Sequence, residues 1–271
     1  MKQIDWNAIA ALMGKDLRAV RRTKAVLIPM LAVPGVLLVL LPLGLTFAAS
    51  RAAAGRSVTQ FLDVLPDRVA EPILAHPPEQ QLMVLVGGFL LAPLFLIVPL
   101  MVSAVLAADA FAGEKERKTL ETLLHLPLRD RDLYLAKLFA AFIPSVGVAW
   151  AGFTLYAIVV NAIAWPVMHR VFVPNGNWLL LIGWVAPAVA ALGLGIMVRI
   201  SARAQTAQGA HQLGGAVIFP LVFLALGQAT VLLAVDASVA IAVGAVIWSV
   251  ALMLTARGAR RFTRNRLAAA V

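Results

Sequence analysis

The residues best suited to recognition chemistry lie together in one charged segment near the middle of the chain. Residues 109–132 alternate acidic and basic side chains, and their spacing predicts a short amphipathic helix over residues 113–125 that Pro127 ends. Glu114 and Lys118 lie four residues apart in it, in the favourable order for a helical ion pair. Paired charges of both signs fix register and orientation, so this helix is suited to docking another protein. The alternative is an ordinary loop helix with solvated charges.

Motifs for catalysis are missing from the sequence. No Gly-x-x-x-x-Gly-Lys-Ser/Thr pattern occurs, since Gly14-Lys15 is followed by Asp16 and lacks the earlier glycine, so this chain cannot build a P-loop. No His-Glu-x-x-His motif occurs, and with no cysteine in the chain, thiolate chemistry and disulfides are excluded. The four histidines are scattered along the chain: His76, His125, His169 and His211. We therefore expect no enzyme, no metal site and no cofactor in this chain.

The composition decides which kind of protein must position the charged segment. Of the 271 residues, 62% are hydrophobic and only 13% are charged, which excludes a soluble or disordered chain. The net charge of +10 resembles that of a nucleic-acid-binding protein. In so apolar a chain, however, basic loops of a multi-pass membrane protein are the better explanation, and no nucleic acid is expected.

Six stretches are long and apolar enough to cross a membrane as helices. The predicted fold is all-α, with spans at residues 25–48, 82–108, 134–165, 178–198, 209–235 and 237–256. Residues 1–24 repeat apolar side chains at helical spacing and are otherwise basic, which predicts an amphipathic helix lying on anionic lipid headgroups. A solvated basic segment is the alternative. Residues 257–271 form a basic tail.

The distribution of basic residues predicts the orientation of the spans. With the N-terminus inside, 19 of the 23 Lys and Arg residues fall on the cytoplasmic side and 4 on the outer side. Both termini and the charged segment are therefore predicted to be cytoplasmic. The spans carry almost no charge, because Asp109 and Lys137 lie at inner ends from which we expect them to reach the interface. The scarcity of intramembrane carboxylates disfavours a proton- or sodium-coupled transporter.

Prolines and glycines within the predicted spans indicate kinks and close helix contacts. Pro93 and Pro99 are expected to kink the second span, since neighbouring helices can satisfy the freed carbonyls. Gly193 and Gly195 permit another helix to approach closely. Packing is the first interpretation of these residues, and a hinge for alternating access is the second.

The charged segment resembles the signature of type-2 ATP-binding-cassette (ABC) exporter permeases. The resemblance lies in residues 112–124, Ala-Gly-Glu-Lys-Glu-Arg-Lys-Thr-Leu-Glu-Thr-Leu-Leu, followed by Pro127 and by Ala136-Lys137-Leu138. Ala136 stands where glycine is commoner in the family. A weaker likeness follows at residues 203–208. Six spans, cytoplasmic termini and a surface helix before the first span agree with the same family.

This resemblance implies a half-size permease that forms the substrate pathway as a dimer, or with a similar permease, in the bacterial inner membrane. A separate ABC ATPase subunit, which would bind the ATP and Mg²⁺, would dock on a coupling helix at residues 112–127. The residues implied in ATPase contact or in anchoring the coupling helix are Glu114, Lys115, Glu116, Arg117, Lys118, Leu120, Glu121, Leu123 and Leu124. A secondary contact is implied for Arg199, Arg203, Gln205 and Gln208. The family also suggests a re-entrant piece late in the fifth span, with a break at Gly227-Gln228.

Two other functions stay open at this stage. One is a secondary transporter or channel that acts alone. The other is a non-transporting membrane anchor that recruits a cytoplasmic partner through the same charged segment. The substrate is not predicted by the sequence.

Overall fold

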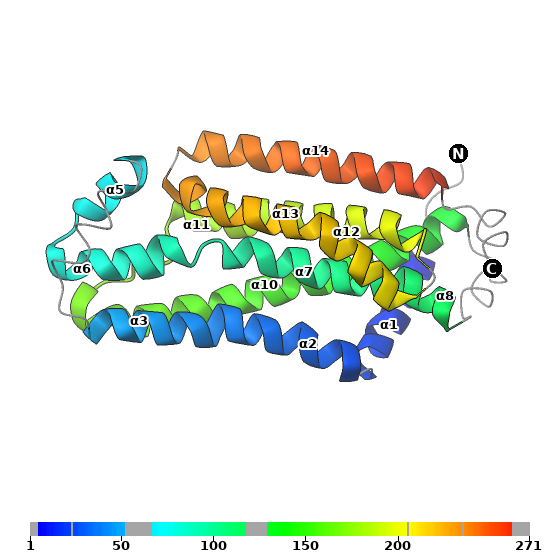
Figure 1. Cartoon of the computed structure of the whole chain (residues 1–271), viewed down its shortest axis with the longest axis horizontal. Coiled ribbons are helices and arrows are strands. Elements are labelled where there is room, and N and C mark those ends of the chain that lie inside the picture. Colours follow the sequence, from blue (N-terminus) through cyan, green and yellow to red (C-terminus); the bar gives the residue numbers. More distant parts are fainter. Residues whose placement is uncertain are drawn as a thin grey trace.

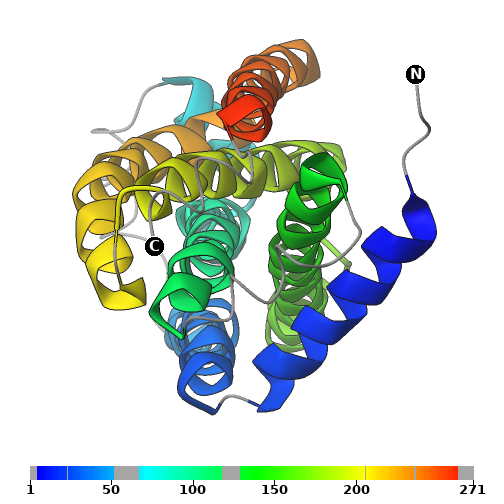
Figure 2. The same cartoon turned by 90° about the vertical axis from the view of Figure 1, so that its right-hand side faces the viewer.

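The computed structural model describes residues 5–22, 24–51, 67–117, 129–204, 206–234 and 236–261, and these form a bundle of long helices (Figure 1). No strand occurs in those ranges. Of the sequence-predicted coupling segment, residues 118–128 lie outside them, as does Gln205. The long helices run roughly parallel to the long axis of the bundle, whereas α1 (Trp6–Arg22) lies across one end at an angle (Figure 2).

Five helical segments in the described ranges are long and apolar enough to span a membrane. They are Met30–Arg51, Pro78–Glu116, Asp130–Met168, Gly176–Ser201 and Ala237–Arg260. The prediction of an all-helical membrane protein with several spans is therefore confirmed. The remaining predicted span, residues 209–235, coincides with α13 (Ala207–Ala234), a helix of 28 residues. It is continuous through Gly227 and Gln228, so the break suggested there is wrong.

Some of these segments are single α-helices, and others contain a π-helical stretch between two α-helices. The first comprises α2 (Lys24–Gly35), a π-helical stretch Val36–Leu40 (η1) and α3 (Leu41–Arg51). The third is the single helix α10 (Asp130–Met168), whose 39 residues measure about 58 Å and so exceed the hydrocarbon thickness. The fourth joins α11 (Gly176–Leu180), a π-helical stretch Leu181–Val185 (η4) and α12 (Ala186–Ser201). The last is α14 (Ala237–Arg261).

The second and fourth segments form the centre of the bundle. In the most apolar window of Pro78–Glu116, 78% of the residues are buried, against 17% for Ala237–Arg260. α7 (Leu94–Ala108) packs against α10, α12 and α13, and α12 packs in turn against α14. A Cβ on Gly193 would lie 3.0 Å from the Leu100 carbonyl oxygen, and one on Gly195 would lie 3.0 Å from Leu254 Cβ. Both glycines therefore serve close helix packing, as predicted.

The second segment is interrupted where Pro93 was expected to kink it. A π-helical stretch Val84–Leu90 (η2) is followed by a three-residue turn at residues 91–93, and α7 begins at Leu94. Proline has no N–H to donate, so carbonyls on its N-terminal side need other partners. The Tyr156 hydroxyl donates to the Gly87 carbonyl, and Trp178 Nε1 donates to the Gly88 carbonyl at 3.1 Å. Neutral side chains from other helices thus stabilise the interruption.

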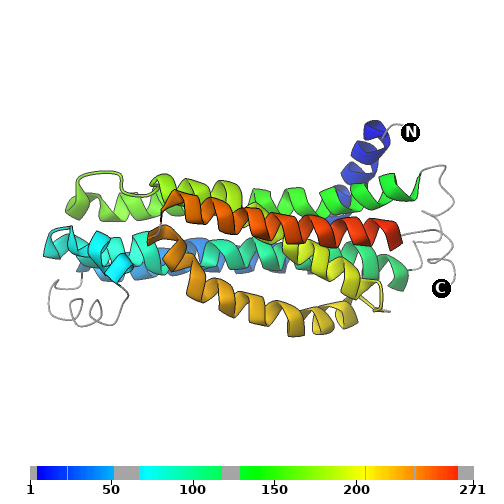
Figure 3. The same ribbon diagram turned by 90° about the horizontal axis from the view of Figure 1, so that it is seen from above.

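The two ends of the bundle carry different elements, as Figure 3 shows from above. We call the end with α1, the start of α10 and the end of α14 the junction end. The opposite end, called the far end, carries α5 (Asp67–Leu74), α6 (Pro78–Met83) and the connection between α10 and α11. Asn161 holds this connection, since its Nδ2 donates to the Val173 carbonyl and its Oδ1 accepts from the Phe172 N–H at 3.0 Å.

Candidate functional site: a charged junction at the end of the second span

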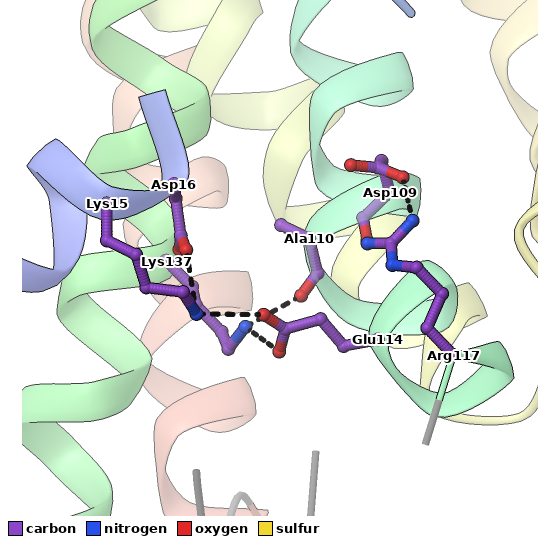
Figure 4. A network of polar contacts seen from close by, with 7 residues as sticks. All are labelled: Lys15, Asp16, Asp109, Ala110, Glu114, Arg117 and Lys137. Atoms are coloured by element: carbon purple, nitrogen blue, oxygen red, sulfur yellow. Dashed lines mark hydrogen bonds and ion pairs between the residues drawn. The ribbon is translucent and has the colours of Figure 1, made fainter. Parts of the chain in front are cut away.

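The second span ends in a group of charged side chains that contact one another, α1 and α10 (Figure 4), and also the connection between α12 and α13. Its apolar helix α7 continues as a π-helical stretch Asp109–Gly113 (η3) and a single turn Glu114–Glu116 (α8). We call this group the charged junction; its members are Lys15, Asp109, Glu114, Lys115, Glu116, Arg117 and Lys137.

The centre of the charged junction is a buried ion pair between the second and third spans. Lys137 on α10 is 1% exposed and Glu114 is 6% exposed. The Lys137 ammonium donates to Glu114 Oε2 and, at 2.9 Å, to the carbonyl oxygen of Ala110. The ammonium of Lys137 is therefore enclosed by protein groups. A partner carboxylate and a carbonyl inside the bundle stabilise its charge in place of water.

Helix α1 contacts the same carboxylate from the other side. Lys15 Nζ lies 4.0 Å from Glu114 Oε1 and 3.5 Å from Asp16 Oδ1. Further along α1, the ring of Trp6 lies 6.4 Å from that of Phe139 on α10. Glu114 therefore joins three elements: α1, the end of the second span, and α10.

The next two residues hold the connection between α12 and α13. Lys115 Nζ donates to the carbonyl oxygen of Ala202, directly after α12, at 3.0 Å. Glu116 Oε2 accepts from the backbone N–H of Ala207, the first residue of α13, at 2.9 Å. A carboxylate at a helix N-terminus satisfies a free N–H group and interacts favourably with the helix dipole. Consecutive residues 115 and 116 thus fix the end of one span and the start of the next.

Arg117 turns back along the second span. Its Nη1 donates to Asp109 Oδ1 at 2.9 Å. Burial by itself would lower the pKa of Arg117, but the hydrogen bond and charge of Asp109, together with the charges of Glu114 and Glu116, raise that pKa above its usual value. The guanidinium therefore stays charged at every physiological pH and neutralises Asp109.

A cavity of about 190 Å³ opens between α1, α10 and the end of the second span. Lys15, Asp16, Asp109, Glu114 and Arg117 supply polar groups to its wall, and small or apolar residues of α1, α7, η3 and α10 complete it. α1 therefore contacts the bundle through polar groups around this cavity and also through apolar side chains, since Ile9 is 3% exposed and Val20 packs against the buried core.

The sequence-predicted coupling residues are brought together only in part. Glu114, Lys115, Glu116 and Arg117 lie in the charged junction, each in contact with another element of this chain. Arg199, Arg203 and Gln208 are exposed at the same end of the bundle. The other predicted members lie outside the described residues: Lys118, Leu120, Glu121, Leu123, Leu124 and Gln205.

Sequence reasoning missed the roles of Lys137 and Lys15. Lys137 was noted as an early charge in the third span, and Lys15 as one of several basic residues on an amphipathic helix. One signal was available, because Glu114 and Lys137 carry opposite charges at the adjoining ends of two spans joined by a single loop. Such ends lie close together, so the pairing could have been proposed.

In the described ranges, no group of three or more His, Asp or Glu side chains is arranged to hold a metal ion.

The sequence model of the ABC-2 family transporter proteins matches residues 10–257. The chain belongs to this family. No curated protein shows a significant match to it. As an ABC-2 permease, the chain is a membrane subunit for transport and is not itself catalytic, and such permeases generally pair with an ABC ATPase.

Proposed function

We propose that this chain is the membrane subunit of an ABC exporter, forms the substrate pathway as a dimer, and is driven by a separate ATPase docked on residues 112–127. The observation that carries the proposal is the charged junction. It lies where this loop leaves the second span, and it connects the loop to α1, α10 and the α12–α13 connection.

These contacts provide a mechanical route from the loop to the spans. Each attachment from residues 114 to 116 is made by a charged side chain, and charged hydrogen bonds are stronger and more directional than neutral ones. A displacement of the loop by the ATPase would move the second and third spans, the ends of α12 and α13, and α1 together. ATP and Mg²⁺ would be bound by the ATPase partner.

The junction end would face the cytoplasm of a bacterial inner membrane. The support is the bias of basic residues, since 19 of the 23 Lys and Arg residues belong to this side of the predicted topology. At about 42 Å, α13 is long enough to serve as the sixth span. ATP is available in the cytoplasm, so this orientation also places the loop where the ATPase operates.

The peripheral helices would contact lipid and a second permease copy. Apolar side chains such as Leu252 on α14 and Ile158 on α10 are exposed, at 59% and 62%. Apolar faces of this kind are suited to a bilayer or to helix packing within one.

Co-purification of an ABC ATPase with the full chain tests the proposal. The chain is co-expressed with the ABC ATPase subunits of its own genome, purified in lipid nanodiscs, and assayed for bound ATPase and for ATP hydrolysis. Reversing the loop charges by Lys118→Glu with Glu121→Lys is expected to reduce bound ATPase about tenfold. Arg170→Glu, a charge reversal at an exposed residue of the far end, is the control and should leave binding unchanged.

Two results would contradict the proposal. Substrate movement by the chain alone in liposomes without ATP would favour a secondary transporter or channel. A complex that binds the ATPase and hydrolyses ATP while no solute ever crosses the membrane would favour a membrane anchor.

A further inference from the structure

Lys137 carries a charge that packing alone does not require. It is 1% exposed, and its ammonium forms an ion pair with the carboxylate of Glu114, itself 6% exposed. A buried ion pair is often no more stabilising than well-packed apolar residues of the same volume. Buried ionisable groups are costly, and those within membrane proteins commonly have a functional role. The function of Lys137 is therefore to be found in the groups that its ammonium holds in place.

The ammonium contacts both ends of one turn of the second span. It donates to the carbonyl of Ala110, inside η3, and to the carboxylate of Glu114, the first residue after η3. A π-helical turn is wider than an α-helical one and leaves carbonyls that need other donors, which Lys137 supplies. It therefore stabilises η3 in its π-helical form.

A second ion pair closes η3 on its other side. Arg117 donates to Asp109, the first residue of η3, across Gly113. A Cβ at position 113 would lie 2.8 Å from Asp109 Oδ1 and 3.2 Å from Arg117 Nη1, so glycine is needed for this pair to close. Two cations thus hold the same five residues, one from α10 and one from the turn that follows.

The helical form of η3 determines where the next residues point. Each residue of an α-helix turns the chain by about 100°, so converting the wide turn to an α-helical one would rotate everything after it. Lys115 and Glu116 would then point away from Ala202 and Ala207, which they now contact at 3.0 and 2.9 Å. The direction in which the chain enters the loop beyond Arg117 would change with them.

We propose that Lys137 is a positioning residue: by holding Ala110 and Glu114 together, it keeps η3 π-helical and sets the direction of the loop that follows. The link from loop direction to ATP-driven work rests on the proposed function. The conformational part stands on the chain alone.

The conformational part is tested by crosslinking in the full chain, which has no cysteine of its own. Glu116→Cys and Ala207→Cys are combined, and their reaction with a short bifunctional thiol reagent is timed in nanodiscs. Glu114→Gln with Lys137→Met removes both charges and leaves no unpaired one, so this variant is expected to fold. It should crosslink about tenfold more slowly, as expected for loss of one charged hydrogen bond.

Three variants complete the series. Lys137→Arg keeps a charged donor and should restore most of the crosslinking rate. Glu114→Gln alone keeps the Lys137 bond to Ala110 and should give an intermediate rate. Arg131→Met, an exposed cation on the same helix, is the control and should match the parent. Equal rates in the parent and in the doubly neutral variant would overturn the proposal.

The functional part is read from ATP hydrolysis by the complex with the ATPase. The doubly neutral variant, with its native residues at positions 116 and 207, should hydrolyse ATP about tenfold more slowly per bound ATPase than the parent, because the loop is misdirected. Unchanged hydrolysis would overturn the positioning role. If no ATPase binds even to the parent chain, the proposed function fails, whereas the crosslinking result still decides whether Lys137 sets the form of η3.

Discussion

The two ends of the bundle are held together by different chemistry. At the far end and in the interruption of the second span, neutral side chains form the stabilising hydrogen bonds. Tyr156 and Trp178 donate to carbonyls of η2, and Asn161 holds the α10–α11 connection. At the junction end the same task falls to charged groups, with Lys137 and Glu114 at the centre. Neutral donors satisfy backbone groups at low desolvation cost, which suits a fixed region.

Charged groups have a different advantage. Their interactions are strong only when the charges are paired and oriented, and moving one partner leaves a buried charge unpaired at a large energetic cost. A region that must transmit a displacement gains from such contacts, because a small shift changes its energy substantially. The comparison therefore suggests a static far end and a responsive junction end. The variants below test that difference, in order of decreasing expected effect.

Lys137→Met should have the largest effect on stability. It leaves the buried Glu114 carboxylate without its main partner, which costs about 3–5 kcal/mol in comparable buried pairs. The measurement is unfolding in mixed micelles with increasing SDS, followed by tryptophan fluorescence. Adding Glu114→Gln should recover most of the loss; a single variant as stable as the parent would show that the pair is not needed to offset burial.

Asn161→Leu tests the far end. The substitution keeps the branched shape of the side chain but leaves the Phe172 N–H and the Val173 carbonyl without their partner, at a cost of about 2–3 kcal/mol. The same unfolding assay applies. ATP hydrolysis by the complex, corrected for the folded fraction, should be unchanged, and a specific loss of hydrolysis would contradict a static far end.

Tyr156→Phe should have a smaller effect. It removes only the hydroxyl that donates to the Gly87 carbonyl, and one unsatisfied buried group costs about 1–2 kcal/mol. Packing with Phe95, Phe153 and Trp178 is retained, since their ring centroids lie 4.9, 6.3 and 5.6 Å from that of Tyr156. A loss as large as that of Lys137→Met would remove the distinction between neutral and charged contacts.

Arg117→Met should have the smallest effect on stability. Its side chain is 52% exposed, so the pair with Asp109 is screened by water and is expected to contribute less than about 1 kcal/mol. That contribution should vanish in 1 M NaCl, where the Debye length is about 3 Å, whereas the effect of Lys137→Met should persist. Equal salt sensitivity of the two variants would mean that Lys137 is not shielded from solvent.

Much of the fold could be predicted from the sequence because membrane spans depend on composition alone. Long apolar runs predicted the helices. Pro93 predicted the interruption of the second span, and Gly193 and Gly195 predicted close contacts between helices. The 39-residue length of α10 and its start at Asp130 were not predicted, since polar residues that continue a span at its end resemble a loop. The π-helical stretches η2, η3 and η4 were not predicted either, because carbonyls in them accept hydrogen bonds from side chains on other helices.

The sequence indicated which residues carry the charges of the site, but not which side chains they contact. The charged segment identified Glu114 to Arg117, and a search for i,i+4 pairs within one helix assigned Glu114 to Lys118. The structure places the Glu114 carboxylate between Lys137 and Lys15, which lie on other helices. Contacts between helices depend on how each helix is rotated about its axis, and a wide turn such as η3 changes that rotation.

Site-specific photo-crosslinking tests whether the loop after the charged junction docks an ATPase. A photoreactive residue is introduced at position 117 and, in a separate variant, at Arg170 on the far end, and each complex is irradiated in native membranes. The account predicts that position 117 crosslinks to an ABC ATPase subunit and position 170 does not. An ATPase crosslink from position 170, or none from position 117 while the complex is intact, would contradict it.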